Sequence, residues 1–223
     1  GGAAEPLTDT SAAPGLVNLG IAHIPAGDQA IITLKVRVAN NDQANAGVSF
    51  ANTASYTYAG MPAGVTTAST SAPLTIVEPK VALAKTVTNV THPGAAPSVG
   101  DDLRYSLRFT ARGGKVGDLF SDAFDLGIVD SLSPGLAYRS GTARVDGAGN
   151  TIADPAVTGD GRTTAQTLTW RPAATAGIDV AEGSVVTVTY DVLVLDNVLP
   201  GQKLTNSATA QWTGQDGAST FER

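Results

Sequence analysis

The chain has 223 residues, a formal net charge of −6 at pH 7, 42% hydrophobic residues and no cysteine. Without cysteine it has no disulfide, no thiolate catalysis and no cysteine-ligated metal, and its 14 scattered Lys and Arg residues form no basic stripe that would bind nucleic acid. No stretch is apolar over the length of a membrane span, so the composition predicts a globular chain of one large or two small domains.

Short runs of alternating apolar and polar residues, separated by Gly, Pro, Asn and Asp, recur from end to end. This period of two is typical of half-buried β-strands, and no segment has the period of an amphipathic helix. In chain order, the predicted strands lie at 32–38, 72–79, 81–87, 124–130, 186–194 and 204–212. An irregular insertion, with room for one helical turn at Leu119-Phe120, is expected at 111–122. The predicted fold class is all-β.

The chain also contains an internal repeat. Gly20-Ile21, Gly27, a strand, Asn40 and the motif at 50–54 follow the same order as Gly177-Ile178, Gly183, a strand, Asn197 and the motif at 204–208. Residues 1–79 match only the second half of this unit, whereas 80–223 hold nearly all of one and stop before its last strand. Both ends are therefore expected to be cut through a domain, and neighbouring repeats or copies of the same chain are expected to complete the exposed strand edges.

Three polar residues, Lys85, Asp130 and Asn206, occupy strand positions where an apolar residue belongs. The apolar neighbours of Lys85 on its strand face are Val81, Leu83 and Val87. Asp130 continues the even-numbered apolar row of the strand at 124–130, and Asn206 lies on the apolar face of the strand at 204–212. The sequence therefore predicts that an amine, a carboxyl and a carboxamide point into one core.

These groups can form an amide between two side chains. An unprotonated Lys85 amine attacks the carboxamide carbon of Asn206, and ammonia is expelled. Burial is expected to lower the pKa of Lys85, which supplies the nucleophile, and to raise the pKa of Asp130. A protonated Asp130 then hydrogen-bonds the Asn206 carbonyl as negative charge develops and carries a proton to the leaving amine. The predicted product is a Lys85–Asn206 crosslink promoted by Asp130, with no cofactor and no metal.

Each of the three residues also has an ordinary structural explanation. A strand lysine can extend from a sheet edge into solvent, an aspartate before Ser131 can form a turn, and an inward asparagine can satisfy a β-bulge. The combination of all three at strand spacing favours the bond. Asn52 repeats the inward setting of Asn206 among Phe50, Ala54, Tyr56 and Tyr58. Its lysine and acid would lie upstream of Gly1, so no bond is expected at Asn52.

Four motifs in order carry a family resemblance. They lie at 81–87, 99–105, 129–138 and 204–208. The chain resembles the immunoglobulin-like repeats of large bacterial surface proteins, which include isopeptide-forming fimbrial and adhesin domains, over 80–223 and, in the second half of the unit only, over 1–79. This resemblance implies tandem immunoglobulin-like β-sandwiches in an extracellular stalk, fibre or adhesin, not an enzyme, with any adhesion ligand bound elsewhere in the full protein. Ser133, between Leu132 and Pro134, departs from the family's usual Leu-Pro.

Two other functions compete with this interpretation. A carbohydrate-binding β-sandwich needs exposed aromatic platforms, whereas Tyr105, Trp170, Tyr190, Tyr138 and Trp212 all continue apolar rows. A calcium-stabilised adhesion repeat would draw its ligands from Asp101, Asp102, Asp118, Asp122 and Asp125, although no loop has the dense Asp/Asn/Gly spacing of an EF-hand. Hydrolase motifs such as G-x-S-x-G and H-E-x-x-H are absent from the sequence.

Overall fold

The structure is a computed structural model that describes residues 7–11, 15–38, 46–63, 65, 67–111, 120–147, 149–170 and 177–217. The strands in these residues are β1 to β16, and no described residue is helical. No helix in the described part is long and apolar enough to cross a membrane. The prediction of an all-β chain is confirmed. The insertion expected at 111–122 falls mostly on residues outside the described ranges, including the turn at Leu119.

By compactness the chain divides into two units, residues 1–38 and 39–223. In the first unit, β1 (Leu7–Asp9) pairs antiparallel with β2 (Leu19–Ile21). The strand predicted at 32–38 is wrong, because these residues belong to no strand and their apolar side chains are exposed, 82% in the case of Val36. An alternating sequence has one apolar face that could be buried, but a strand forms only where a neighbouring strand pairs with its backbone N–H and C=O groups.

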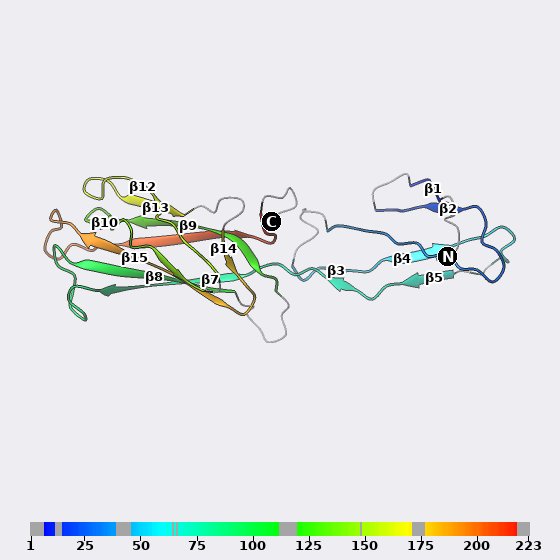
Figure 1. Cartoon of the computed structure of the whole chain (residues 1–223), viewed down its shortest axis with the longest axis horizontal. Coiled ribbons are helices and arrows are strands. Elements are labelled where there is room, and N and C mark those ends of the chain that lie inside the picture. The colour runs from blue at the N-terminus through cyan, green and yellow to red at the C-terminus, as the bar shows by residue number, and fades with distance from the viewer. Residues whose placement is uncertain are drawn as a thin grey trace. The chain divides into compact units, whose positions relative to one another are not determined.

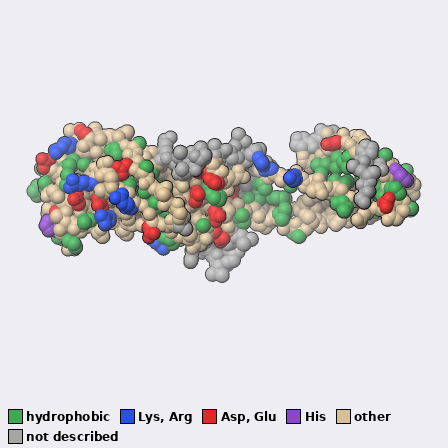
Figure 2. Space-filling model, in the orientation of Figure 1, with side chains coloured by type: hydrophobic (Ala, Val, Ile, Leu, Met, Phe, Trp, Pro, Cys, Tyr) green, Lys and Arg blue, Asp and Glu red, His purple; other side chains and the backbone are tan. Residues whose placement is uncertain are grey.

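Two short antiparallel pairs follow in the second unit. β3 (Ser49–Phe50) pairs with β6 (Leu74–Thr75), and β4 (Thr53–Tyr56) pairs with β5 (Thr67–Thr70). The strand predicted at 72–79 is thus only two residues long. The inward setting predicted for Asn52 is wrong, because it is exposed together with its neighbours, and Tyr56 is 63% exposed. A two-stranded pair has too little area to bury either of its faces, and hydrophobic side chains reach the surface along this segment (Figure 2).

Residues 81–213 form two antiparallel sheets packed face to face, as the prediction of a β-sandwich required (Figure 1). Sheet one has the order β10-β15-β8-β7, with β11 also paired to β15. Its strands are β7 (Val81–Asn89), β8 (Asp102–Ala111), β10 (Leu136–Tyr138), β11 (Arg144–Asp146) and β15 (Val185–Val194). The boundary predicted between residues 79 and 80 remains a prediction.

Sheet two is built around β9. Its strands are β9 (Ala123–Leu132), β12 (Ala156–Thr158), β13 (Gln166–Trp170), β14 (Ile178–Val180) and β16 (Asn206–Thr213). β13 and β14 follow one another along one edge of β9, and β16 pairs along its other edge. Among the described strands, β7 is therefore an edge strand of sheet one, next to β8, and β16 is an edge strand of sheet two, next to β9.

The core follows the predicted alternation closely. On β15 the even-numbered residues are buried, and Tyr190 and Val192 are fully so. On β9 the even row holds from Leu126 to Leu132 but fails at Phe124, which is only half-buried. Asp125 has a left-handed φ of 53°, and the register with β14 and β16 shifts at this point. One extra residue in β9 therefore forms a bulge that reverses the faces of the residues before it.

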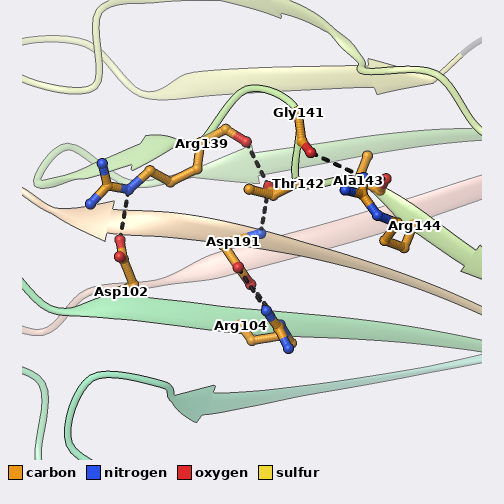
Figure 3. A network of polar contacts seen from close by, with 8 residues as sticks. All are labelled: Asp102, Arg104, Arg139, Gly141, Thr142, Ala143, Arg144 and Asp191. Atoms are coloured by element: carbon orange, nitrogen blue, oxygen red, sulfur yellow. Dashed lines mark hydrogen bonds and ion pairs between the residues drawn. The ribbon is translucent and has the colours of Figure 1, made fainter.

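Ion pairs lie on the outer face of sheet one (Figure 3). Arg104 on β8 binds both carboxylate oxygens of Asp191 on β15, at 2.7 and 2.9 Å, and Arg139 binds Asp102 at 2.7 Å. The Thr142 hydroxyl donates to the Arg139 carbonyl and accepts from the Asp191 backbone N–H, which ties the β10–β11 connection to β15. Exposed pairs of this kind contribute about 0 to 1 kcal/mol each, so the energetics of the domain depend on the inner faces.

Candidate functional site

The three polar residues predicted to share a core lie in one site between the two sheets. Asp130, on β9, is fully buried, and it lies between Ile128 and Leu132 in the same inward-facing row of residues. Lys85 extends inward from β7, and its side chain is 17% exposed. Asn206 is the first residue of β16 and is half-buried. The face predicted for Lys85 holds for Val81 and Leu83, whereas Val87, two residues before the end of β7, is 50% exposed.

A continuous chain of hydrogen bonds connects these residues. The Lys85 Nζ donates to Asp130 Oδ2 at 2.5 Å. The Tyr190 hydroxyl donates to the same oxygen at 2.5 Å and accepts a hydrogen bond from Asn206 Nδ2 at 2.9 Å. The amine, the acid and the carboxamide are therefore joined through one tyrosine hydroxyl.

Two oxygens in the site have no hydrogen-bond partner among the described residues: Oδ1 of Asp130 and Oδ1 of Asn206, both buried. The hydrogen bond predicted from Asp130 to the Asn206 carbonyl is accordingly not among the contacts of the described residues. Burial raises the pKa of Asp130, and the nearby Asn206 carboxamide has a smaller effect that lowers it. A buried carbonyl oxygen without a donor is costly, and a proton on Asp130 Oδ1 would supply one.

Aromatic rings enclose the site. The Tyr105 ring stacks on Tyr190 at 5.6 Å between centroids, and Trp170 lies 5.3 Å from Tyr190 on its sheet-two side. The Lys85 Nζ lies 5.1 Å from the Tyr105 ring centre, within the range of a cation–π contact. Tyr105 and Tyr190 face each other in the register of β8 and β15. The apolar rows of the sequence predict only that both tyrosines belong to the core, since their place beside Lys85 depends on strand pairing that no local pattern reveals.

Burial shifts both ionisable partners toward their neutral forms. Desolvation lowers the pKa of Lys85, and this effect outweighs the hydrogen bond and charge of Asp130, which act in the opposite direction. Desolvation also raises the pKa of Asp130 against the hydrogen bonds from Lys85 and Tyr190. An uncharged amine beside a protonated carboxyl is the pair that nucleophilic attack on a carboxamide requires.

The aspartates considered as calcium ligands have separate structural roles. Asp101 accepts hydrogen bonds from Asn89, His92 and the Ser98 backbone. Asp122 caps the Glu182 backbone N–H and Asp125 accepts from the Gly217 N–H, whereas Asp118 lies outside the described residues. No three His, Asp or Glu side chains in the described ranges are placed to hold a metal ion together.

Asp101 closes the loop between β7 and β8, and we expect Asp101→Asn to lower the melting temperature. Hydrogen bonds, the Ser98 backbone N–H first, hold the Asp101 pKa below its usual value. A depressed carboxyl pKa stabilises the fold above the unfolded pKa, and this stability is lost as pH falls through the folded pKa. Thermal melts between neutral pH and about pH 3 should therefore show a smaller acid-induced loss in the variant. Asp196→Asn, in an exposed pair with Arg162, is the control that should change little.

No protein-family model matches the chain, and no curated protein matches its sequence. Among solved structures it is similar to the pilus backbone RrgB from Streptococcus pneumoniae, with 19% identity and a TM-score of 0.38 over 60% of this chain and 53% of that one. It is also similar to full-length RrgB, with 18% identity and a TM-score of 0.37 over 60% of this chain and 23% of that one. A third similar structure is the collagen binding domain of the Erysipelothrix rhusiopathiae surface protein RspB, with 20% identity and a TM-score of 0.33 over 77% of this chain and 52% of that one. The chain thus spans about half, or less, of each of these chains.

Proposed function

We propose that this chain is a structural module of a bacterial surface stalk, fibre or adhesin, in which Lys85 and Asn206 form an intramolecular isopeptide bond promoted by Asp130. The observation that carries the proposal is the hydrogen-bonded path from the Lys85 amine through Asp130 to the Asn206 carboxamide. The surface location follows from the resemblance of the four sequence motifs to surface-protein repeats.

Strand direction supports the pairing of Lys85 with Asn206. The Trp212 indole donates to the carbonyl of Pro79 at 3.3 Å, which brings the start of β7 to the end of β16. Six residues forward from Pro79 is Lys85, and six residues back from Trp212 is Asn206. β7 and β16 run in opposite directions (Figure 1), so Lys85 and Asn206 lie the same number of residues from the Pro79–Trp212 contact, in the same direction along the sandwich. The equal spacing from the Pro79–Trp212 contact supports the pairing of Lys85 with Asn206.

The reaction balances without a cofactor. The Lys85 Nζ–Asn206 Cγ bond forms, the Cγ–Nδ2 bond breaks, one proton moves from Nζ to Nδ2, and ammonia leaves. The fold holds the reacting groups together, so proximity supplies much of the rate. Because the product remains part of the chain, each molecule reacts once, and the chain is not an enzyme in the ordinary sense.

A bond at this place suits a module under tension. Force applied to the chain on either side of the sandwich domain enters β7 near Pro79 and leaves β16 near Trp212, and these two residues are in contact. With the crosslink in place, tension passes from Lys85 directly to Asn206, and the roughly 120 residues between them carry none of it. Neighbouring repeats, or copies of the same chain, are the proposed partners for the exposed apolar residues of 31–38 and 46–77.

Intact mass under denaturing conditions tests the bond. We expect the full chain to weigh one ammonia less than its sequence mass, and Lys85→Ala to have the full mass. Lys80→Ala, which changes an exposed lysine just before β7, is the matched control and should keep the deficit. Fragmentation should then recover one branched peptide containing Lys85 and Asn206. A wild-type chain with its full sequence mass would refute the crosslink.

A further inference from the structure

Tyr190 occupies a position in the site that the chemistry above does not use. Its side chain is fully buried in the middle of β15. Its hydroxyl donates to Asp130 Oδ2 at 2.5 Å and accepts from Asn206 Nδ2 at 2.9 Å. The hydroxyl therefore stands between the acid and the nitrogen that must depart as ammonia.

The direction of these two hydrogen bonds determines how the carboxamide lies. A tyrosine hydroxyl has one proton, and Tyr190 directs that proton toward Asp130. It therefore presents only lone pairs to Asn206, and only the amide N–H₂ can satisfy them. The carboxamide nitrogen is held on the acid's side, and its carbonyl oxygen is left without a protein partner among the described residues.

We propose that Tyr190 orients Asn206 and relays the proton from Asp130 to the departing nitrogen. This inference rests on the proposed Lys85–Asn206 bond. In the planar carboxamide, Nδ2 has no basic lone pair and donates to Tyr190. After attack by Lys85, the same nitrogen is a tetrahedral amine and becomes an acceptor. Asp130 first gives the proton on its Oδ1 to the Asn206 carbonyl oxygen, and its Oδ2 then takes one proton from Nζ. The two hydrogen bonds of Tyr190 then reverse: Asp130 Oδ2 donates this proton to Tyr190, and Tyr190 gives its own proton to Nδ2.

The proton count closes at the end of this step. One proton has left Nζ and one has arrived at Nδ2. As the carbonyl re-forms, its oxygen returns the borrowed proton to Asp130, so Asp130 and Tyr190 end with the protons they held before. The Cγ–Nδ2 electron pair leaves with ammonia, and no oxidant or reductant is involved. Burial and the neighbouring Asp130 raise the pKa of the Tyr190 hydroxyl, so it remains protonated and can pass a proton only while receiving another.

The surrounding rings keep the hydroxyl in place. Tyr105 stacks on the Tyr190 ring, Trp170 packs against it, and Tyr138 lies 6.1 Å away between centroids. Phenylalanine at position 190 would retain these ring contacts and lose only the hydroxyl. Tyr138 is the matched comparison, because its own hydroxyl donates to Asp154 at 2.7 Å and does not contact Asp130 or Asn206.

The first test measures the rate of crosslinking in newly made chains. Full-length protein is synthesised in a cell-free system, samples are quenched in denaturant at intervals, and the fraction that has lost ammonia is read by mass. We expect Tyr190→Phe to crosslink at least about 100-fold more slowly than wild type, and Tyr138→Phe to react at the wild-type rate. Both tyrosine variants are also unfolded in a Lys85→Met background, where no bond forms, to show that Tyr190→Phe remains folded.

The second test separates proton transfer from a purely structural role. Fluorinated tyrosine, placed at position 190 alone, keeps the ring and hydroxyl but makes the hydroxyl more acidic. A crosslinking rate that changes with this acidity supports the relay. An unchanged rate, or a folded Tyr190→Phe protein that crosslinks as fast as wild type, overturns the relay and leaves the bond itself standing. A wild-type chain that never loses ammonia overturns both.

Discussion

Replacing Lys85 by methionine is expected to lower the free energy of unfolding by about 4 to 5 kcal/mol, because the crosslink closes a loop of about 120 residues. Methionine is the informative choice, since it fills the space of the lysine stem without the amine. Burial raises the pKa of Asp130, so the carboxyl that has lost its lysine partner can stay protonated and does not become an unpaired buried charge. The loss can then be attributed to the bond. Guanidinium unfolding of both proteins gives the difference, and added reductant should change neither curve.

Pulling on the two ends of the chain provides a mechanical measurement of the same variant. In Lys85→Met, unfolding of the sandwich should release roughly 400 Å of chain between positions 85 and 206. In the crosslinked wild type that length should remain hidden at any force that leaves covalent bonds intact. The chain ahead of β7 serves as an internal control, because it is uncrosslinked in both proteins. Equal extensions, or equal unfolding free energies, would contradict a bond that closes this loop.

Sequence patterns succeeded where a complete sandwich satisfied them. The alternation of β15 and β16 predicted which faces are inward, because both strands have neighbours and an opposing sheet. The same period at 32–38 predicted a strand that the structure lacks. A local pattern reports which residues would be buried if a partner were present, but it contains no information about the partner.

The residues of the site could also be predicted only in part from the sequence. Lys85, Asp130 and Asn206 could be found because each interrupts an apolar row. Tyr190 could not, because a tyrosine in an apolar row is an ordinary core residue, and its role depends on which strands lie opposite it. The bulge at Asp125 shows the other limit, since one residue with a left-handed φ reverses the faces before it and nothing in the alternation marks it. Topology and backbone irregularities therefore had to come from the structure.

Asp130→Asn is expected to slow crosslinking by at least about 100-fold, since a carboxamide cannot exchange the proton that a carboxyl carries. The variant also separates two roles. In the structure Asp130 opposes the fall in the Lys85 pKa, so its removal leaves more of the lysine uncharged and nucleophilic. If the acid served only to adjust the lysine, crosslinking in Asp130→Asn would be as fast as in wild type or faster. A slower reaction in spite of a better nucleophile identifies proton transfer as the function of the carboxyl.

The pH dependence of the rate makes the same distinction in the wild-type chain. At acid pH the rate should fall as Lys85 becomes protonated, and at alkaline pH it should fall as Asp130 loses its proton, so the two limbs belong to the coupled pair. Any residual reaction of Asp130→Asn should keep the acid limb and lose the alkaline one. Asp191→Asn, which removes a carboxylate paired with Arg104 on the outer face of the same sheet, should keep both limbs and the full rate. An alkaline limb that persists in Asp130→Asn would mean that a different group supplies the proton to the leaving ammonia.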